Sequence, residues 1–379
     1  NRDSALVLAI ATKPLPADLV LDLNYATQRA ACVAQWQQLL DRGMQVTVPE
    51  ARVNHAARHL LIQNHTLIKG DRMHYSAGNQ YDQLYEAEGS DAMLAMLAWG
   101  YPADARRLTA PLLDFTRKGL EFHQAGHKLQ LLAHLHAFTH DEAFLREMRP
   151  RWAKEIQLIV NSRTNAEGLF PREQYCGDIA TPVFSLNSNA KAWRALHDFS
   201  ATLTALGERD EALRLAKVAG EFKQNILAAI AKSTRAAQPG FVPIALSGEE
   251  EPYDVITATK MGSYWNLMAN YVLGSGILPE PRERGLLEYL QQHGGLALGM
   301  TRSRPGVSFW TGPHSANPLY GTRYVLTLLR RDEPDRALVS FYGMLAQGFT
   351  RDTFIAGEGS SLTPLDARGR RPVAHSTTG

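Results

Sequence analysis

The lengths of the connections between predicted helices constrain the fold of this chain more than any other feature. Four connections are short, and they span residues 100–104, 139–141, 207–210 and 331–334. Four others are long, and they span residues 68–88, 162–186, 233–257 and 294–316. Short loops join antiparallel neighbours, so each such pair of helices forms a hairpin. Since short and long connections roughly alternate, the long loops are expected to gather at one end of the molecule.

The helical segments themselves have apolar residues at spacings near i, i+3 and i+4. They fall at residues 27–42, 50–66, 89–99, 102–118, 126–139, 141–161, 187–206, 208–232, 258–274, 280–293, 317–330 and 333–347. Six hairpins closed into a ring make an all-α (α/α)6 toroid, which is the fold that we predict. An open α-solenoid or two separate bundles are the alternatives, although the sequence shows no solenoid repeat. Short strands are expected only within connections, at residues 45–48 and 241–246.

The composition is that of an ordinary globular protein, with 379 residues, 45% hydrophobic and 21% charged. No linker rich in proline, serine or glycine divides the chain, so we expect one toroid domain over 1–379, with an extended lead-in over 1–25. A net charge of +2 favours neither nucleic acid nor an anionic membrane as a partner. The chain opens at Asn1 without methionine, as expected of a processed chain or a piece of a longer protein.

The two cysteines, Cys32 and Cys176, fit no metal-binding spacing, and we interpret them as isolated thiols. No apolar run is long enough to span a bilayer, and residues 5–11 lack the flanks of a signal peptide. We therefore expect a soluble protein. The compartment stays open between cytoplasm and periplasm, and the oligomeric state stays open as well.

The long loops are dense in aromatic residues, glycines and single charges, a combination that suits a carbohydrate site. Hydrolysis of a glycosidic bond needs one carboxyl group to protonate the leaving oxygen and a second to activate water or attack the sugar. We predict Asp178 as the general acid and Glu358 as the general base or nucleophile, because each follows a glycine in a long loop. The alternatives are that Asp178 caps a turn or pairs with Arg172, and that Glu358 lies in a surface turn.

Several further residues are predicted to bind the substrate, which we expect to be a carbohydrate, with neither a metal nor a cofactor. They are Tyr85, Glu86, Glu88, Lys128, Arg172, Tyr175, Trp265 and Trp310. Four of these, Tyr85, Glu88, Arg172 and Trp265, come from three different long loops and are expected to line one pocket. The alternative for Glu86 and Glu88 is that they only favour the N-terminus of the following helix electrostatically.

Two clusters of charged or titratable residues are given no role in the site. His123 and His127 have the spacing of a metal pair on a helix, but no third ligand is evident. The run of Glu249, Glu250 and Glu251 is interpreted as a solvated turn.

In order and spacing, residues 60–379 resemble the six-hairpin glycosidases, the group that includes glucoamylases and the processing α-glucosidase type. The unit 85–97 resembles their first active-site segment, with Glu88 nearest to the charged position that binds the sugar at subsite −1. Residues 168–196 resemble the loop that supplies the general acid, and residues 357–359 occupy the late position of the general base. The resemblance implies a toroid and an inverting hydrolysis. The Trp-x-Arg-Asp signature of glucoamylases is absent, so glucose at subsite −1 is not implied.

Three functions are compatible with these observations, since fold alone does not choose among them. The main hypothesis is a glycoside hydrolase acting on an oligo- or polysaccharide through a pair of carboxylates. A polysaccharide lyase or an unsaturated-uronyl hydrolase is the second. A lyase would need a base and cations, for which Tyr175, His123, His127, Lys128 and Arg172 are available. The third is a carbohydrate-binding toroid without catalytic activity.

Overall fold

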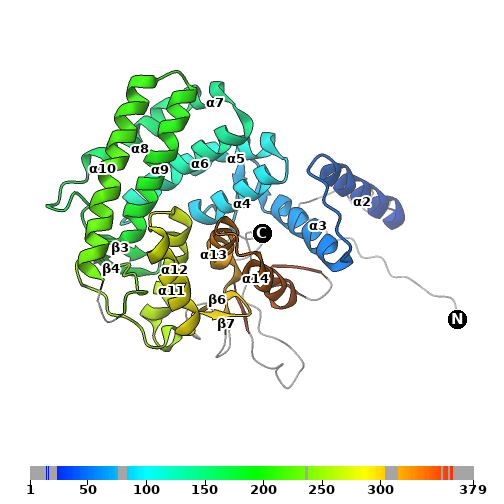
Figure 1. The fold of residues 1–379 in the computed structure, drawn as a ribbon. Coiled ribbons are helices and arrows are strands. Elements are labelled where there is room, and N and C mark those ends of the chain that lie inside the picture. The colour runs from blue at the N-terminus through cyan, green and yellow to red at the C-terminus, as the bar shows by residue number, and fades with distance from the viewer. Residues whose placement is uncertain are drawn as a thin grey trace.

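A ring of helices dominates the structure, a computed structural model that describes residues 14, 16, 24–75, 83–234, 238–303, 315–350, 353–356 and 359–361. These residues form an all-α toroid, which confirms the predicted fold class (Figure 1). The expected lead-in over 1–25 lies almost wholly outside the described residues.

Five helices of the described part of the chain line the inside of the ring. They are α4 (Glu86–Ala98), α6 (Glu121–Thr139), α9 (Leu186–Ala205), α11 (Lys260–Ser275) and α13 (Pro318–Arg330). Consecutive members of this series pack against each other. The middle three, α6, α9 and α11, are buried along most of their length, because other helices cover them on both sides.

The contact between α6 and α9 depends on a glycine. A Cβ atom at Gly126 of α6 would lie 2.9 Å from the backbone of Ala192 in α9. Glycine therefore lets the two helix backbones approach more closely than any other residue would. This explains why Gly126 interrupts an otherwise good helical sequence between His123 and His127.

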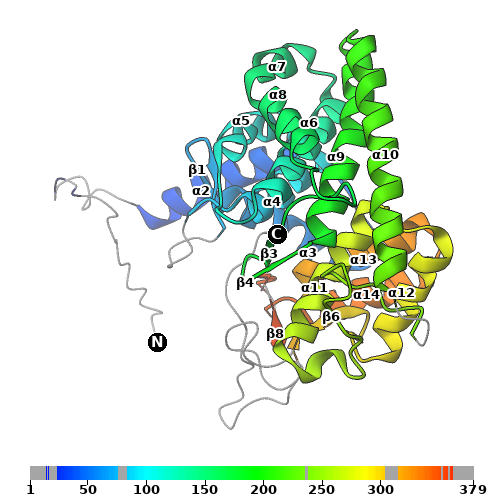
Figure 2. The same ribbon diagram turned by 90° about the vertical axis from the view of Figure 1, so that its left-hand side faces the viewer.

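A second layer of helices covers the outside of the ring, as α10 does beside α9 (Figure 2). These helices are α3 (Ala51–Thr66), α5 (Pro102–Asp114), α8 (Arg149–Asn161), α10 (Arg209–Ser233), α12 (Glu280–Gln292) and α14 (Pro334–Gln347). The predicted helix over 141–161 is divided into α7 (Glu142–Glu147) and α8. The division falls before Pro150, because proline has no backbone N–H and is tolerated only in the first turn of a helix. Every other predicted segment corresponds to one helix.

The connections that lead from an outer to an inner helix meet at the end of the ring where the inner helices begin, and they carry the strands. Strand β1 (Ile68–Lys69) pairs with β2 (Arg72–Met73), and β3 (Glu173–Cys176) pairs with β4 (Ile179–Val183). Strands β5 (Leu296–Ala297), β6 (Met300–Ser303), β7 (Ser315–Ala316) and β8 (Ser360–Ser361) form one antiparallel sheet. The prediction that the long loops share one face is thereby confirmed.

The prediction of two strands, at residues 45–48 and 241–246, is wrong. Residues 45–48 have no strand partner, and within 241–246 only Ala245 forms an isolated bridge, with Ser185. The apolar residues of 241–246 are instead buried in the core beside the start of α9. Burial explains the apolar run there without any sheet.

The first helix of the structure departs from the ring, so the described residues supply five inner helices where the six predicted hairpins need six. Helix α2 (Tyr25–Asp41) lies at the edge of the molecule, beyond α3 (Figure 1). Almost all of its residues are exposed, and Leu40 in its last turn is the one described as buried. The hydroxyl of Tyr101 donates to the carbonyl oxygens of Leu39 and Leu40, at 3.3 Å each. Helix α2 is therefore attached to the body mainly by its C-terminal turn.

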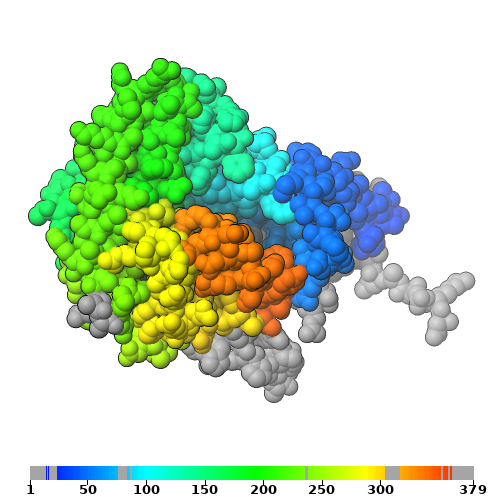
Figure 3. Space-filling model, in the orientation of Figure 1, coloured from blue at the N-terminus to red at the C-terminus, as the bar shows by residue number. Residues whose placement is uncertain are grey.

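The two ends of the inner series, α13 and α4, are joined by an ion pair that we call the closing contact. Nη2 of Arg323 in α13 lies 2.9 and 3.1 Å from the two carboxylate oxygens of Asp91 in α4. A cavity of about 560 Å³ lies beside it, lined by residues of all five inner helices. The surface is recessed between the orange α13 and the cyan and blue segments of α3 to α5 (Figure 3).

Candidate active site

Asp178 lies where three elements of the long-loop face meet. It stands at the tip of the β3–β4 hairpin, and its Oδ2 accepts a hydrogen bond of 3.1 Å from the hydroxyl of Tyr264 in α11. Nη2 of Arg117, from the connection before α6, donates to the carbonyl of Gly177 at 2.7 Å. The hairpin tip is therefore held over the N-terminal ends of the inner helices. Asp178 is exposed there rather than enclosed by apolar neighbours, and it does not pair with Arg172.

A second carboxyl group, Glu173, lies at the base of the same hairpin and was not singled out from sequence. Its side chain is buried, and Oε1 accepts the backbone N–H of Phe122 at 2.7 Å, in the first turn of α6. Burial raises the pKa of Glu173 to about 7, although the amide of Phe122 acts in the opposite direction. The sequence carries no signal for this burial, because the partner amide is contributed by a distant helix.

A pH-dependent stability follows from this raised pKa. The folded protein keeps the Glu173 proton up to a pH of about 7, whereas the ordinary pKa is 4.5. This proton stabilises the folded state fully below the unfolded-state pKa of 4.5, and the stabilisation is lost as the pH rises towards the folded-state pKa of about 7. Glutamine cannot ionise, so the free energy of unfolding of Glu173→Gln should not fall in this pH range as that of wild type does. Between about pH 5 and about pH 8, the free energy of unfolding of the variant should rise relative to that of wild type by on the order of 2 kcal/mol.

Urea unfolding of both proteins at the two pH values measures this difference, and histidine contributions cancel in the comparison. The exposed Glu288 provides the matched control, since Glu288→Gln should shift stability equally at both pH values. Equal pH dependence of Glu173→Gln and wild type would show that Glu173 is ionised in the folded protein.

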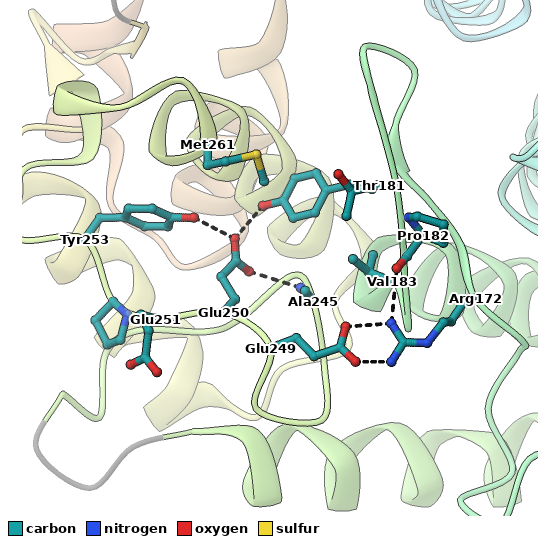
Figure 4. A pocket seen from close by; sticks show the side chains of 12 residues that line it. Arg172, Thr181, Pro182, Val183, Ala245, Glu249, Glu250, Glu251, Tyr253 and Met261 are labelled. Carbon is teal, nitrogen blue, oxygen red and sulfur yellow. Dashed lines mark hydrogen bonds and ion pairs between the residues drawn. The ribbon is translucent and has the colours of Figure 1, made fainter.

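Arg172 and Tyr175, both predicted for the site, line a pocket of about 420 Å³ beside the β3–β4 hairpin (Figure 4). Arg172 forms a bidentate ion pair with Glu249, in which Nη1 lies 2.9 Å from Oε2 and Nη2 contacts Oε1. The hydroxyl of Tyr175 donates to Oε1 of Glu250 at 2.7 Å. Since Glu250 is buried, the interpretation of 249–251 as a solvated turn is wrong for that residue, whereas Glu249, although paired, and Glu251 are exposed.

Glu250 organises the wall of this pocket. Its Oε1 also accepts from the hydroxyl of Tyr253 at 2.9 Å, and its Oε2 accepts the backbone N–H groups of Ile244 and Ala245 at 2.6 and 3.0 Å. Burial raises the pKa of Glu250, and these four donors oppose the shift. A buried carboxyl group with this many partners fixes the two tyrosine rings and the loop that carries it.

The residues predicted near the start of α4 lie on the same face of the ring. Tyr85 is the residue before α4, its hydroxyl accepts from Nε2 of Gln83 at 2.8 Å, and its ring contacts Tyr75 edge-on. Glu88 is half-buried in the first turn, and Glu86 begins the helix. Neither Tyr85 nor Glu88 lines the pocket that contains Arg172, so the predicted convergence of these three residues on one pocket is not found.

Two other predicted site residues belong to the interior of the fold. Trp265 is 0% exposed, its Nε1 donates to the carbonyl of Val242 at 2.9 Å, and its ring stacks on Phe241. It is a core residue, and the prediction that it lines a pocket is wrong. Lys128 lies between α6 and α8, where Nζ is 3.1 Å from Oε1 of Glu155 and both side chains are buried. Trp310 and Glu358 lie outside the described residues.

His123 and His127 lie one turn apart in the buried part of α6. The rings of His123 and His127 are 6.1 Å apart, and His123 also contacts Tyr271 of α11. Burial, reinforced by the charge of Lys191, lowers the pKa of His123 to about 3 and that of His127 well below its usual value. Both imidazoles are therefore neutral at physiological pH. No group of three possible metal ligands exists among the residues that the structure describes.

Comparison with known proteins supports the fold. No family model matches the chain, and no curated protein matches its sequence. Among solved structures, a glycosidase in complex with glucose is similar with a TM-score of 0.61 and 11% identity, over 81% of this chain and 86% of that one. A rhamnosidase from Klebsiella oxytoca with rhamnose bound has a TM-score of 0.56 and 12% identity, over 81% of this chain and 56% of that one.

A third similar structure is the cellobiose 2-epimerase from Bacillus thermoamylovorans, with a TM-score of 0.53 and 9% identity, over 85% of this chain and 93% of that one. At these identities the likeness shows a shared fold, that of the helical toroids of sugar-processing enzymes. No helix among the described residues is long and apolar enough to cross a membrane.

Proposed function

We propose that this protein is a glycoside hydrolase that acts on an oligo- or polysaccharide by an inverting mechanism. Asp178 is the general acid and Glu358 the general base. The observation that carries the proposal is the position of Asp178, held by Tyr264 and by the neighbouring Arg117–Gly177 contact over the N-terminal ends of the inner helices. Its side chain is exposed to a substrate there, while its backbone is fixed by the hairpin.

The fold adds support of a more general kind. The glycosidase and the rhamnosidase with the same fold are described with glucose and with rhamnose bound, respectively. In an inverting enzyme the two carboxyl groups stand about 6.5–9.5 Å apart, which leaves space for the attacking water. A bound sugar would cover the exposed side chain of Asp178 at the tip of the hairpin.

A polysaccharide lyase is less well supported, because Tyr175, Arg172 and Lys128, three of the five groups available to it, are engaged in the structure. Tyr175 donates its hydroxyl to Glu250, and burial holds its pKa well above the usual value, which makes it a poor base. Arg172 is neutralised by Glu249, and Lys128 by Glu155. No cation of this group is left to neutralise a uronate.

A panel of nitrophenyl glycosides and of di- and trisaccharides of glucose and rhamnose tests the proposal. We expect release of the leaving group from at least one of them, with proton NMR of the first product showing the inverted anomer. The Glu358→Gln protein, prepared in parallel, excludes a contaminating hydrolase, because it should lose activity on every substrate of the panel. Binding of a sugar without turnover would instead indicate a carbohydrate-binding toroid, and an unsaturated product would indicate a lyase.

A further inference from the structure

The pocket beside the β3–β4 hairpin has no role in the chemistry described so far. One wall is formed by Thr181, Pro182 and Val183 of β4, and the opposite wall by Tyr253 and Met261 (Figure 4). The paired side chains of Arg172 and Glu249 stand at one side of it. The pocket thus combines apolar walls with a polar rim.

The same two elements that build this pocket also position Asp178. Thr181 follows Asp178 by three residues on the hairpin, a distance of roughly 10 Å along a strand. On the other side, Met261 and Tyr264 lie about one turn apart on α11, and Tyr264 donates to Asp178. The pocket therefore borders the same hairpin and the same helix that hold the candidate acid.

The walls are rigid before any ligand arrives. Glu250 receives hydrogen bonds from Tyr175, from Tyr253 and from two backbone amides, which fixes both tyrosine rings and the 244–250 loop. Nη1 of Arg172 also donates to the carbonyl of Pro182 at 3.1 Å, which ties the rim to β4. A site built in this way loses little conformational entropy when it binds a ligand.

The chemistry of the lining fits a neutral sugar. The apolar side chains of Val183, Met261 and Tyr253 can contact the C–H face of a pyranose. The ion pair of Arg172 with Glu249 leaves further N–H donors and carboxylate lone pairs for hydroxyl groups. Since the arginine of the lining is paired with Glu249, an anionic sugar is disfavoured.

On the basis of the proposed function, we propose that this pocket is the leaving-group subsite and that the natural substrate is a neutral oligosaccharide. A general acid protonates the oxygen that departs with the leaving group, so the sugar on that side of the bond must lie on the side of Asp178. We assign the pocket to that side because it borders the β3–β4 hairpin and α11, the two elements that hold Asp178. The part of the substrate that precedes the cleaved bond would then lie at the N-terminal ends of the inner helices.

Substitution of Thr181 tests this assignment, because its side chain is exposed and a large residue there would fill the pocket without entering the core. The measured quantity is kcat/KM for a trisaccharide divided by kcat/KM for the glycosyl fluoride of the same sugar, whose small leaving group leaves the subsite empty. We expect Thr181→Trp to lower this ratio about tenfold or more and Arg172→Ala to lower it in the same direction, because only the trisaccharide uses the subsite. Thr204→Trp, exposed at the opposite end of α9, should leave the ratio unchanged.

The outcomes separate this inference from the proposed function. If wild type hydrolyses both substrates and neither pocket variant changes the ratio, the subsite is elsewhere and the hydrolase stands. If no glycoside is hydrolysed, the proposed function fails. Calorimetry with the trisaccharide then tests whether the pocket binds a sugar. Weaker binding by Thr181→Trp than by Thr204→Trp would retain the pocket as a sugar site. Equal binding by these two variants would overturn it.

Discussion

Replacement of Asp178 by asparagine is expected to lower kcat by about 10²- to 10⁴-fold, the contribution that a positioned general acid makes. Asparagine keeps the size of the side chain and can still accept from Tyr264, so the hairpin should stay in place. Glu358→Gln should cause a loss of similar size. The decisive measurement is kcat on the best substrate of the panel, together with the urea midpoint of each variant.

The leaving group sharpens this prediction. Loss of a general acid slows the departure of a poor leaving group most, so Asp178→Asn should retain more activity on nitrophenyl glycosides than on sugars. Glu358→Gln should affect both substrates alike. Near wild-type turnover of the trisaccharide by Asp178→Asn, with an unchanged urea midpoint, would remove Asp178 from the mechanism.

Loss of one partner of the Lys128–Glu155 pair is expected to destabilise the protein by about 3 to 5 kcal/mol, because the other charge stays buried without compensation. Their side chains are only 7% and 10% exposed, and Nζ lies 3.1 Å from Oε1. Lys128→Met and Glu155→Gln should each show this loss in urea unfolding. The KM of the best substrate should not change, because Lys128 lies between α6 and α8 rather than in a pocket.

The double variant Lys128→Met/Glu155→Leu is the internal control. It removes both charges and should recover most of the lost stability, since a well-packed apolar pair can replace a buried ion pair. A Lys128→Met protein with unchanged stability and a raised KM would restore the substrate-binding role that the sequence suggested.

The fold could be predicted from the sequence because its determinants are local. Apolar spacing identified the helices, and the alternation of loop lengths identified the hairpins. The division of the predicted helix over 141–161 into α7 and α8 depends on Pro150, and the effect of a proline on a helix is also local. The β3–β4 hairpin was not predicted, since its strands are short and their partners are set by the turn at Gly177.

The surroundings of the site could be predicted much less well, because they depend on contacts between distant segments. The buried Glu250 accepts a hydrogen bond from Tyr175, which is 75 residues away in sequence, and the buried Lys128 pairs with Glu155, which is 27 residues away. In sequence, a charged residue with such a partner looks like any surface charge. Trp265 was misassigned for a related reason, since an aromatic residue at the start of a helix suits a core and a cleft equally well.

The closing contact between α13 and α4 gives the ring an uneven resistance to opening. Separating any two consecutive inner helices from α4 to α13 would expose packed apolar surface, with a cost that grows with the area uncovered. Opening the ring between α13 and α4 breaks the Arg323–Asp91 ion pair, and it also separates α3 from α14 and from Phe354, which are held together by hydrogen bonds and a small apolar cluster. This joint buries less apolar surface than the joints between consecutive inner helices, so thermal motion should widen the ring here first and admit water to the interior cavity from the side.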